Sequence, residues 1–211
     1  MRYKHIFWDW NGTLLDDLAP SMGAINVMLE RRGKEVLTVD VFRDRICVPI
    51  IGFYEQTFDM SVECMDPLAE EYHSLYQLLM PADPLARDAK ELLALFYQKG
   101  IKQYIFSSSE TSSIERALKK YGIDGYFDCV IAASDRKAAS KAERTRQYII
   151  DSGIRPCETL FVGDLVHDSE VADYVGADCV LVEYGHEARC RLFSTERNII
   201  SELCELKNIV L

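Results

Sequence analysis

The spacing of apolar and polar residues along the chain predicts strands that alternate with helices. Apolar runs of strand length cover residues 3–8, 101–106, 127–132, 159–162 and 178–182. Stretches with helical spacing lie before and between the later runs, at residues 85–98, 112–121, 141–152 and 168–175. Parallel strands are joined by crossover helices, so this order predicts an α/β fold with a doubly wound parallel sheet covered on both faces. Residues 198–211 predict a closing strand and helix.

The segment between the first two strands has a different pattern, with helical spacing and no convincing strand. Ile25, Met28 and Leu29 fall on one face of a helix that ends at Gly33. Further helices are expected at residues 39–45, 54–60 and 66–79. This part of the chain is therefore predicted to be all-helical.

Two domains follow from this change of pattern. The prolines and Asp in residues 81–84 predict a linker where the helical segment ends. We therefore expect a small all-helical domain at residues 16–82, inserted into an α/β core domain that residues 1–15 and 83–211 form.

Composition and charge limit the number of domains and the kinds of partner that the protein can bind. The chain has 211 residues, 48% of them hydrophobic, which is enough for one sizeable core and a small second lobe. The 34 Asp and Glu residues outnumber the 24 Lys and Arg residues, and the formal charge is −10. This balance argues against nucleic-acid binding and against association with an anionic membrane surface.

The cysteines and the first residues indicate the compartment. The seven cysteines are scattered, odd in number and never paired as Cys-x-x-Cys, so we expect reduced thiols and neither a disulfide framework nor a zinc site. No apolar run approaches the ~20 residues of a membrane span, and the N-terminus lacks the apolar core of a signal peptide. We expect a cytoplasmic protein.

Polar side chains gather where the predicted strands end. The groups at these positions are Asp9, Asn11, Ser107, Ser108, Ser109, Asp135, Lys137, Lys141, Asp164 and Asp168. Ligands of an open parallel sheet bind outside the carboxyl ends of its strands, so these groups predict one pocket. Carboxylates that can hold Mg²⁺, a nucleophilic carboxylate and a lysine that balances phosphate charge suit metal-assisted phosphoryl transfer.

These residues carry a family resemblance. Asp9-Trp10-Asn11-Gly12-Thr13 resembles Asp-x-Asp-Gly-Thr, the first motif of the haloacid-dehalogenase superfamily of hydrolases. Ser107 after an apolar strand, Lys141 at a helix start, and the Gly-Asp-x-x-x-Asp sequence at 163–168 resemble the second, third and fourth motifs in order. The resemblance covers essentially the whole chain. The helical insertion is similar in position to the small cap of phosphoglycolate-phosphatase-like members.

The resemblance implies roles for individual residues. Asp9 would attack the phosphoryl group and become a transient aspartyl phosphate. The implied Mg²⁺ ligands are Asp9, the backbone carbonyl of Asn11, Asp164 and Asp168, the last directly or through water. The implied phosphate contacts are Trp10 through its backbone, Ser107, Ser108 and Lys141. Lys137 is an alternative to Lys141, and Ser108 and Ser109 compete with Ser107.

One position departs from the family pattern. The resemblance places an acid/base Asp where this chain has Asn11, and an amide cannot exchange a proton at neutral pH. Loss of such catalysis typically costs ~10²–10⁴-fold, less for leaving groups that depart as stable anions. Glu110 or His167 could substitute.

Members that cleave carbon–phosphorus bonds also lack this acid, but they need a lysine in the cap that forms a Schiff base. Lys34 is the only lysine between residues 16 and 81, and it lies in a turn. The phosphonate hypothesis is therefore weak.

Two function classes remain. The favoured one is a Mg²⁺-dependent phosphatase that hydrolyses a small soluble phosphorylated metabolite through Asp9. The alternative is a catalytically impaired module of the same fold that binds phosphate and metal, which Asn11 favours. The sequence identifies neither the substrate nor the choice between monomer and homodimer.

Overall fold

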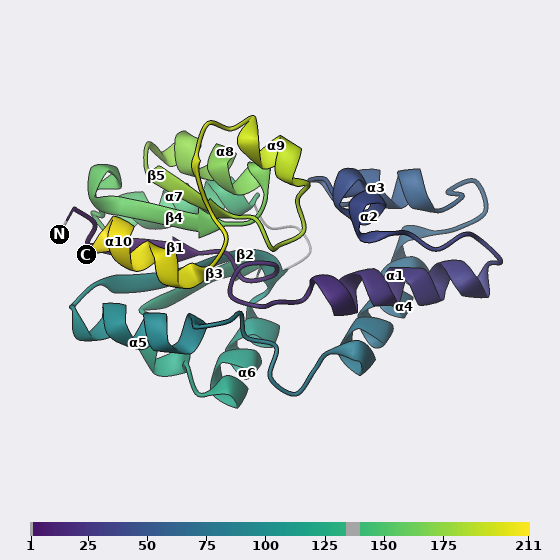
Figure 1. Cartoon of the computed structure of the whole chain (residues 1–211), viewed down its shortest axis with the longest axis horizontal. Coiled ribbons are helices and arrows are strands. Elements are labelled where there is room, and N and C mark those ends of the chain that lie inside the picture. Colours follow the sequence, from purple (N-terminus) through teal and green to yellow (C-terminus); the bar gives the residue numbers. More distant parts are fainter. Residues whose placement is uncertain (1, 134–139) are drawn as a thin grey trace. The chain divides into compact units, whose positions relative to one another are not determined.

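The computed structural model describes residues 2–133 and 140–211 (Figure 1). The strands are β1 (His5–Trp8), β2 (Lys102–Glu110), β3 (Cys129–Ala133), β4 (Thr159–Gly163), β5 (Asp178–Val182) and β6 (Asn198–Ile200). The helices are α1 (Leu18–Arg31), α2 (Val39–Arg45), α3 (Ile51–Thr57), α4 (Met65–Leu79), α5 (Ala89–Gln98), α6 (Thr111–Tyr121), α7 (Lys141–Asp151), α8 (Val166–Val175), α9 (Arg189–Phe193) and α10 (Leu206–Val210). Within the described ranges, none of these helices has the length and apolar character needed to cross a membrane.

The strands form one six-stranded sheet in the order β3-β2-β1-β4-β5-β6, and every neighbouring pair is parallel. β1 lies at the centre, where Phe7 pairs with Tyr104 of β2 and Phe161 of β4. The order reverses beside β1, so the loops that follow β1, β2 and β4 meet at one edge. The predicted α/β fold with a parallel sheet is confirmed.

The alternation of side chains along each strand builds two apolar layers. On one face, Ile6 and Trp8 of β1 pack with residues of α5, α6 and α10. On the other face, Phe7 packs with residues of α7, α8 and α9 (Figure 1). Because both faces are covered, the central strands β1 and β4 carry consecutive buried apolar residues, at 6–8 and 160–162, and not alternating ones.

Several element boundaries differ from the prediction. β2 continues to Glu110, four residues beyond the apolar run, because its end pairs with Ala133 of β3 after a register shift. α5 begins at Ala89 and not at Leu85, whose backbone instead forms an isolated bridge with Leu15. α3 begins before the expected range and ends at Thr57.

The chain divides into two compact units. The first comprises residues 1–16, 85–185 and 189–211 and contains the sheet. The second comprises residues 17–84 with 186–188, and helices α1 to α4 build it. Its apolar core includes Ile25, Met28, Leu29, Phe42, Phe53, Tyr54, Leu68 and Leu75. The predicted face of α1 thus points into a core of its own unit.

The second unit also takes in His186–Ala188, which the sequence pattern does not signal. Nε2 of His186 lies 3.2 Å from Oδ1 of Asp17, and the hydroxyl of Tyr76 donates to Oδ2 of the same carboxylate at 2.6 Å. The rings of His186 and Phe42 also pack edge to face, with their centroids 6.2 Å apart. These contacts tie a short segment from late in the chain to the helical unit.

Candidate active site

Three carboxylates converge at the carboxyl edge of the sheet. Asp9 directly follows β1, and its backbone N–H donates to the carbonyl of Val162 in β4 at 2.8 Å. Asp164 directly follows β4, and Asp168 lies in the first turn of α8. One oxygen from each carboxylate lies within 4.8 Å of the other two, and all three residues are buried. Neighbouring strands that end together therefore bring distant acids to one point.

Lys141 supplies the positive charge of this cluster. It is the first residue of α7, whose start is fixed by a capping box between Ser140 and Glu143. Its Nζ donates to Oδ1 of Asp9 and, at 2.7 Å, to Oδ1 of Asp168. The ammonium is buried and lies 4.0 Å from the centre of the Phe106 ring. The helix start thus places one cation between two carboxylates.

Asp168 organises the turn beside it. Its Oδ2 accepts the backbone N–H groups of Asp164 and Leu165, each at 3.0 Å, while its Oδ1 accepts Lys141. Both oxygens therefore have hydrogen bonds within the protein. Asp168 therefore holds the Lys141 ammonium and the backbone of the turn that carries Asp164 in place.

Asp164 is held from two other sides. Oγ1 of Thr13 donates to Oδ1 of Asp164 at 3.3 Å, and the Tyr184 hydroxyl donates to the carbonyl of Thr13 at 2.6 Å. A Cβ atom built on Gly185 would overlap the Asp164 side chain. The backbone after β5 therefore packs directly against this carboxylate, and position 185 has room for glycine alone.

We expect Gly185→Ala to weaken Mg²⁺ binding about 10–100-fold, the usual cost of disturbing a group that orients a metal ligand. The added methyl group must displace the carboxylate of Asp164. Titration of Mg²⁺ by calorimetry measures the effect. Gly125→Ala is the matched control, because nothing lies within 4 Å of a Cβ atom there. Equal affinities in both variants would contradict this prediction.

Groups around Asp9 have opposing effects on the pKa of its carboxyl group. Burial raises the pKa of Asp9, Lys141 opposes that rise, and the neighbouring carboxylates of Asp168 and Asp164 add to it. The pKa of Lys141 is raised by Asp168 and Asp9, against the effect of its own burial. Lys141 is therefore a cation at neutral pH, and a further cation beside the three carboxylates would favour ionised Asp9.

The turn after Asp9 contains Trp10, Asn11 and Gly12. Gly12 has φ +76°, which lets the chain turn so that the Trp10 carbonyl accepts N–H groups from Leu14 and Leu15. The Trp10 side chain is buried in the core, so any contact of this residue with phosphate must come from its backbone. The side-chain oxygen of Asn11 accepts a hydrogen bond from Ser109 Oγ at 2.8 Å.

The three serines of β2 differ in their surroundings. Ser107 is buried, Ser108 is exposed, and Ser109 contacts Asn11. The backbone N–H of Ser109 donates to Ser107 Oγ at 3.1 Å. Arg144, which the sequence analysis did not single out, donates to the Ser107 carbonyl at 3.1 Å from one turn along α7 beyond Lys141. Its spacing of three residues from Lys141 is the one signal that marks it.

Glu110 and His167, the two candidates to replace the missing acid/base Asp, both contact other groups. Glu110 is the N-cap residue of α6 and accepts hydrogen bonds from the hydroxyls of Ser112 and Ser113. His167 Nδ1 lies 3.1 Å from Glu170 on the surface of α8. Asp135 and Lys137 lie outside the described residues. Of the two candidate lysines, the structure therefore describes Lys141 alone, and this residue contacts Asp9.

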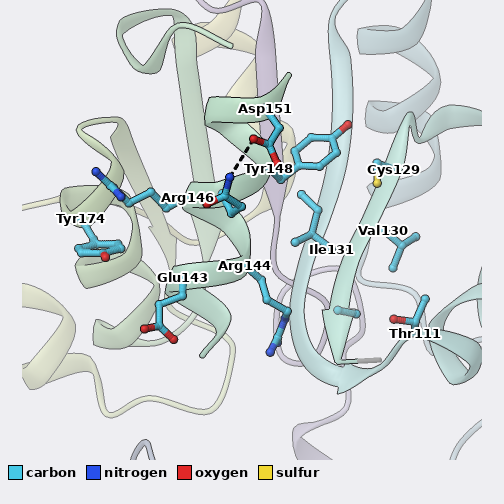
Figure 2. Close-up of a pocket in the computed structure, with 12 residues that line it drawn as sticks. Thr111, Cys129, Val130, Ile131, Glu143, Arg144, Arg146, Tyr148, Asp151 and Tyr174 are labelled. Carbon is cyan, nitrogen blue, oxygen red and sulfur yellow. Dashed lines mark hydrogen bonds between the residues drawn. The ribbon is translucent and has the colours of Figure 1, made fainter. Parts of the chain in front are cut away.

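A cavity of about 790 Å³ lies between β3 and α7. Figure 2 shows Arg144 and Arg146 on the α7 side and Val130 and Ile131 on the β3 side. The side chain of Arg144 connects this cavity to the carbonyl of Ser107.

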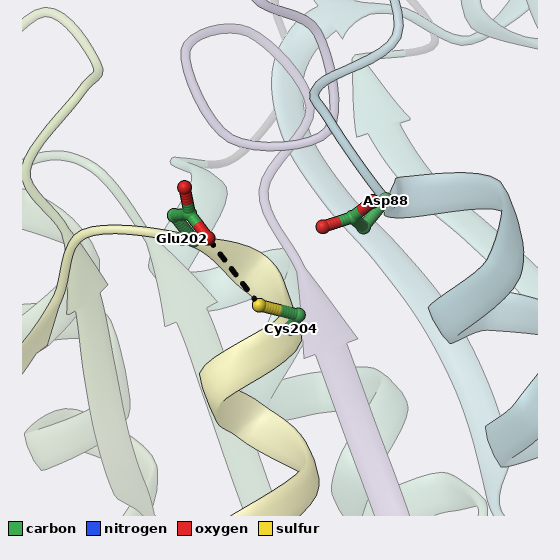
Figure 3. A group of neighbouring side chains, drawn as sticks. All are labelled: Asp88, Glu202 and Cys204. Atoms are coloured by element: carbon green, nitrogen blue, oxygen red, sulfur yellow. Dashed lines mark hydrogen bonds between the residues drawn. The ribbon is translucent and has the colours of Figure 1, made fainter.

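A second group of potential metal ligands, Asp88, Glu202 and Cys204, lies apart in the same unit (Figure 3). Glu202 is exposed there, pairs with Arg87 at 3.2 Å and accepts a hydrogen bond from the Cys204 thiol. The buried group around Asp9, which includes no thiol, is the better candidate for Mg²⁺.

Comparison with known proteins agrees with this geometry. The family model of the haloacid dehalogenase-like hydrolases matches residues 3–176. The chain belongs to this family. The resemblance predicted from the four motifs is thereby confirmed, and the Asp9 turn, Ser107, Lys141 and the 163–168 segment all lie in the matched range.

Relatives of known sequence and structure extend the comparison within the family. The chain is 25% identical to the N-acetylmuramic acid 6-phosphate phosphatase of Pseudomonas aeruginosa, covering 88% of this chain and 84% of that protein. It is 24% identical to the phosphoglycolate phosphatase of Photobacterium profundum, covering 87% and 84%. A haloacid dehalogenase-like protein of Streptococcus pneumoniae has the same fold, with a TM-score of 0.77, 18% identity and coverage of 100% and 99%.

Proposed function

We propose that the protein is a Mg²⁺-dependent phosphatase that hydrolyses a small phosphorylated metabolite through an aspartyl phosphate on Asp9. The observation that carries this proposal is the position of Asp9. Its carboxylate contacts Lys141, and one of its oxygens lies within 4.8 Å of an oxygen of Asp164 and of Asp168, both buried. A carboxylate at the end of a central strand, beside a fixed ammonium, can attack a phosphorus atom presented at the sheet edge.

The donor set fits Mg²⁺. The three carboxylates and the backbone carbonyl of Asn11 are hard oxygen donors, which Mg²⁺ prefers. We assign Asp9, Asn11 and Asp164 as direct ligands and Asp168 as a ligand through water, because both of its oxygens already accept hydrogen bonds. When bound, the ion would neutralise charge on the phosphoryl oxygens.

The remaining groups bind and orient the phosphoryl group. Lys141 balances its charge, Ser107 donates a hydrogen bond, and the backbone N–H groups of the turn that begins at Trp10 complete the cradle. Ser108, which is exposed, is placed at the periphery. The helical unit serves as a cap that excludes water during the reaction.

The relatives support the reaction class. One acts on a sugar phosphate and another on phosphoglycolate, by their names, so they agree on small phosphorylated molecules and differ in the carbon skeleton. All seven cysteines are free thiols, which supports a cytoplasmic location. We propose a monomer or homodimer that binds neither nucleic acid nor membrane, in keeping with the charge of −10.

Removal of the metal tests the proposal. We expect EDTA to abolish hydrolysis of phosphorylated small molecules, and Mg²⁺ to restore it better than Ca²⁺, whose larger and looser coordination suits this compact cluster less well. A screen with and without EDTA, measured by phosphate release, gives the result. Hydrolysis that persists in EDTA after dialysis would remove the metal from the mechanism.

A specific observation favours a second candidate function, that of a phosphate-binding module with negligible turnover. Asn11 stands beside the nucleophile with its oxygen held by Ser109, and an amide supplies no proton. In that case Mg²⁺ and phosphate would bind with affinities like those of active phosphatases, while no substrate would be turned over faster than by an Asp9→Asn control.

A further inference from the structure

Asn11 is held in one orientation beside the nucleophile. It lies two residues after Asp9 in the same turn, and its Oδ1 accepts the hydroxyl of Ser109 at 2.8 Å. Ser109 is fixed in turn, because its backbone N–H donates to Ser107 Oγ at 3.1 Å. The amide nitrogen of Asn11 is a hydrogen-bond donor that cannot release a proton at neutral pH.

Among the residues that the structure describes in this unit, Lys141, Asp168 and Thr13 near Asp9 form hydrogen bonds within the cluster. Lys141 directs N–H groups to Asp9 and Asp168, and both oxygens of Asp168 accept hydrogen bonds. Thr13 donates to Asp164. The hydroxyls of Thr13 and of the serines are too weakly acidic to protonate a leaving oxygen. Among the described residues of the sheet-bearing unit, the groups around Asp9 therefore include no acid placed to protonate a leaving group.

We propose, on the basis of the phosphatase function above, that the site selects phosphoryl donors whose leaving group departs as a stable anion, namely acyl phosphates and phosphoanhydrides. Asn11 stands where an acid would protonate the departing oxygen, and its amide cannot do so. Simple alkyl phosphates, whose alkoxide must be protonated as it leaves, are poor substrates for the same reason.

The first step balances without a proton. A bond forms between an Asp9 oxygen and phosphorus while the bond from phosphorus to the leaving oxygen breaks. The electron pair of the broken bond stays on the leaving oxygen, which departs as a carboxylate or phosphate anion. Because this anion is stable in water, no proton has to be transferred to it, and Asn11 keeps its amide protons.

The second step also proceeds without a protein base. Water adds to the phosphorus of the aspartyl phosphate, the bond to Asp9 breaks with its electron pair on the carboxylate, and the water proton ends on the released phosphate. Lack of a base slows this step as well, so the aspartyl phosphate accumulates. Good substrates should therefore show a burst of released leaving group, followed by a common steady rate.

The test compares leaving groups in the unaltered protein and in Asn11→Asp. The substrates are acetyl phosphate, a series of aryl phosphates with graded leaving-group pKa, and an alkyl phosphate. In the unaltered protein, kcat/KM should fall steeply as the leaving-group pKa rises. In Asn11→Asp, the ratio of kcat/KM for the alkyl phosphate to that for acetyl phosphate should rise about 10²–10⁴-fold, and the burst should disappear.

Controls separate this inference from a structural effect and from the proposed function. Asn208→Asp makes the same chemical change at an exposed position on α10 and should leave the ratio as it is. A shallow dependence on leaving-group pKa in the unaltered protein, or an unchanged ratio in a folded Asn11→Asp variant that binds Mg²⁺, would overturn the inference and leave the phosphatase function standing. Failure to cleave any substrate, acetyl phosphate included, faster than Asp9→Asn would overturn both.

Discussion

Replacement of Asp9 by Asn should lower kcat/KM for every phosphate substrate by at least about 10⁴-fold, the scale seen when a nucleophile is removed from a preorganised site. An amide oxygen at this position can neither form the aspartyl phosphate nor supply a charged ligand to the metal. The remaining groups still bind phosphate, so the substrate should bind to Asp9→Asn without being turned over. Phosphate release measures the loss of turnover, and substrate titration measures the retained binding.

The matched control is Asp16→Asn, the same change at an exposed position in the segment that follows the Asp9 turn. It should retain activity within a few-fold, as surface substitutions usually do. Thermal unfolding of both variants guards against a loss of fold, because Asp9 is buried against Lys141. Residual activity in Asp9→Asn comparable with that of Asp16→Asn would show that another residue attacks the phosphorus.

The fold could be predicted because its signals are local. β1 and β4 contain consecutive apolar residues at 6–8 and 160–162, as is typical of strands covered on both faces, and the helices between the strands carry the 3.6-residue pattern. The end of β2 could not be predicted in this way. Residues from Ser107 to Glu110 are polar and yet extended, because pairing with β3 determines their conformation.

The candidate site was predictable in its acids and less so in its supporting groups. Asp9 and Asp164 each follow a strand, and the topology makes those strands neighbours, so their convergence follows from position alone. The contacts of Ser109 with Asn11 and of Arg144 with Ser107 join residues 98 and 37 positions apart. No periodicity in the sequence encodes such pairs, because packing of the finished sheet selects which of several serines or arginines is in reach.

The same limit explains the segment from His186 to Ala188. It follows an apolar strand and its own composition is unremarkable, so the pattern assigns it to the core domain. In the structure its histidine meets Asp17 and Phe42 of the helical unit. A long-range polar contact and an aromatic contact therefore decide its place, and neither has a local signature.

Replacement of Lys141 by Met should have the second large effect, because it leaves Asp9 and Asp168 buried without their shared cation. We expect the free energy of unfolding to fall by about 3–5 kcal/mol, the usual cost of removing one partner from a buried ion pair. Phosphatase activity should fall about 10²–10³-fold through loss of a charged donor to the phosphoryl oxygens. Urea unfolding and phosphate release measure the two effects.

Lys102→Met is the matched control for Lys141→Met. Lys102 pairs with Asp128 at 2.6 Å, but its side chain is 60% exposed, so water screens the interaction and its loss should leave the urea midpoint close to that of the unaltered protein. Added Mg²⁺ should recover part of the stability lost in Lys141→Met, because a divalent ion offsets the same carboxylate charge, and should have no such effect on Lys102→Met. If both variants unfold at the same urea concentration, the ammonium of Lys141 is not what holds the three carboxylates together, and the electrostatic basis of the site is wrong.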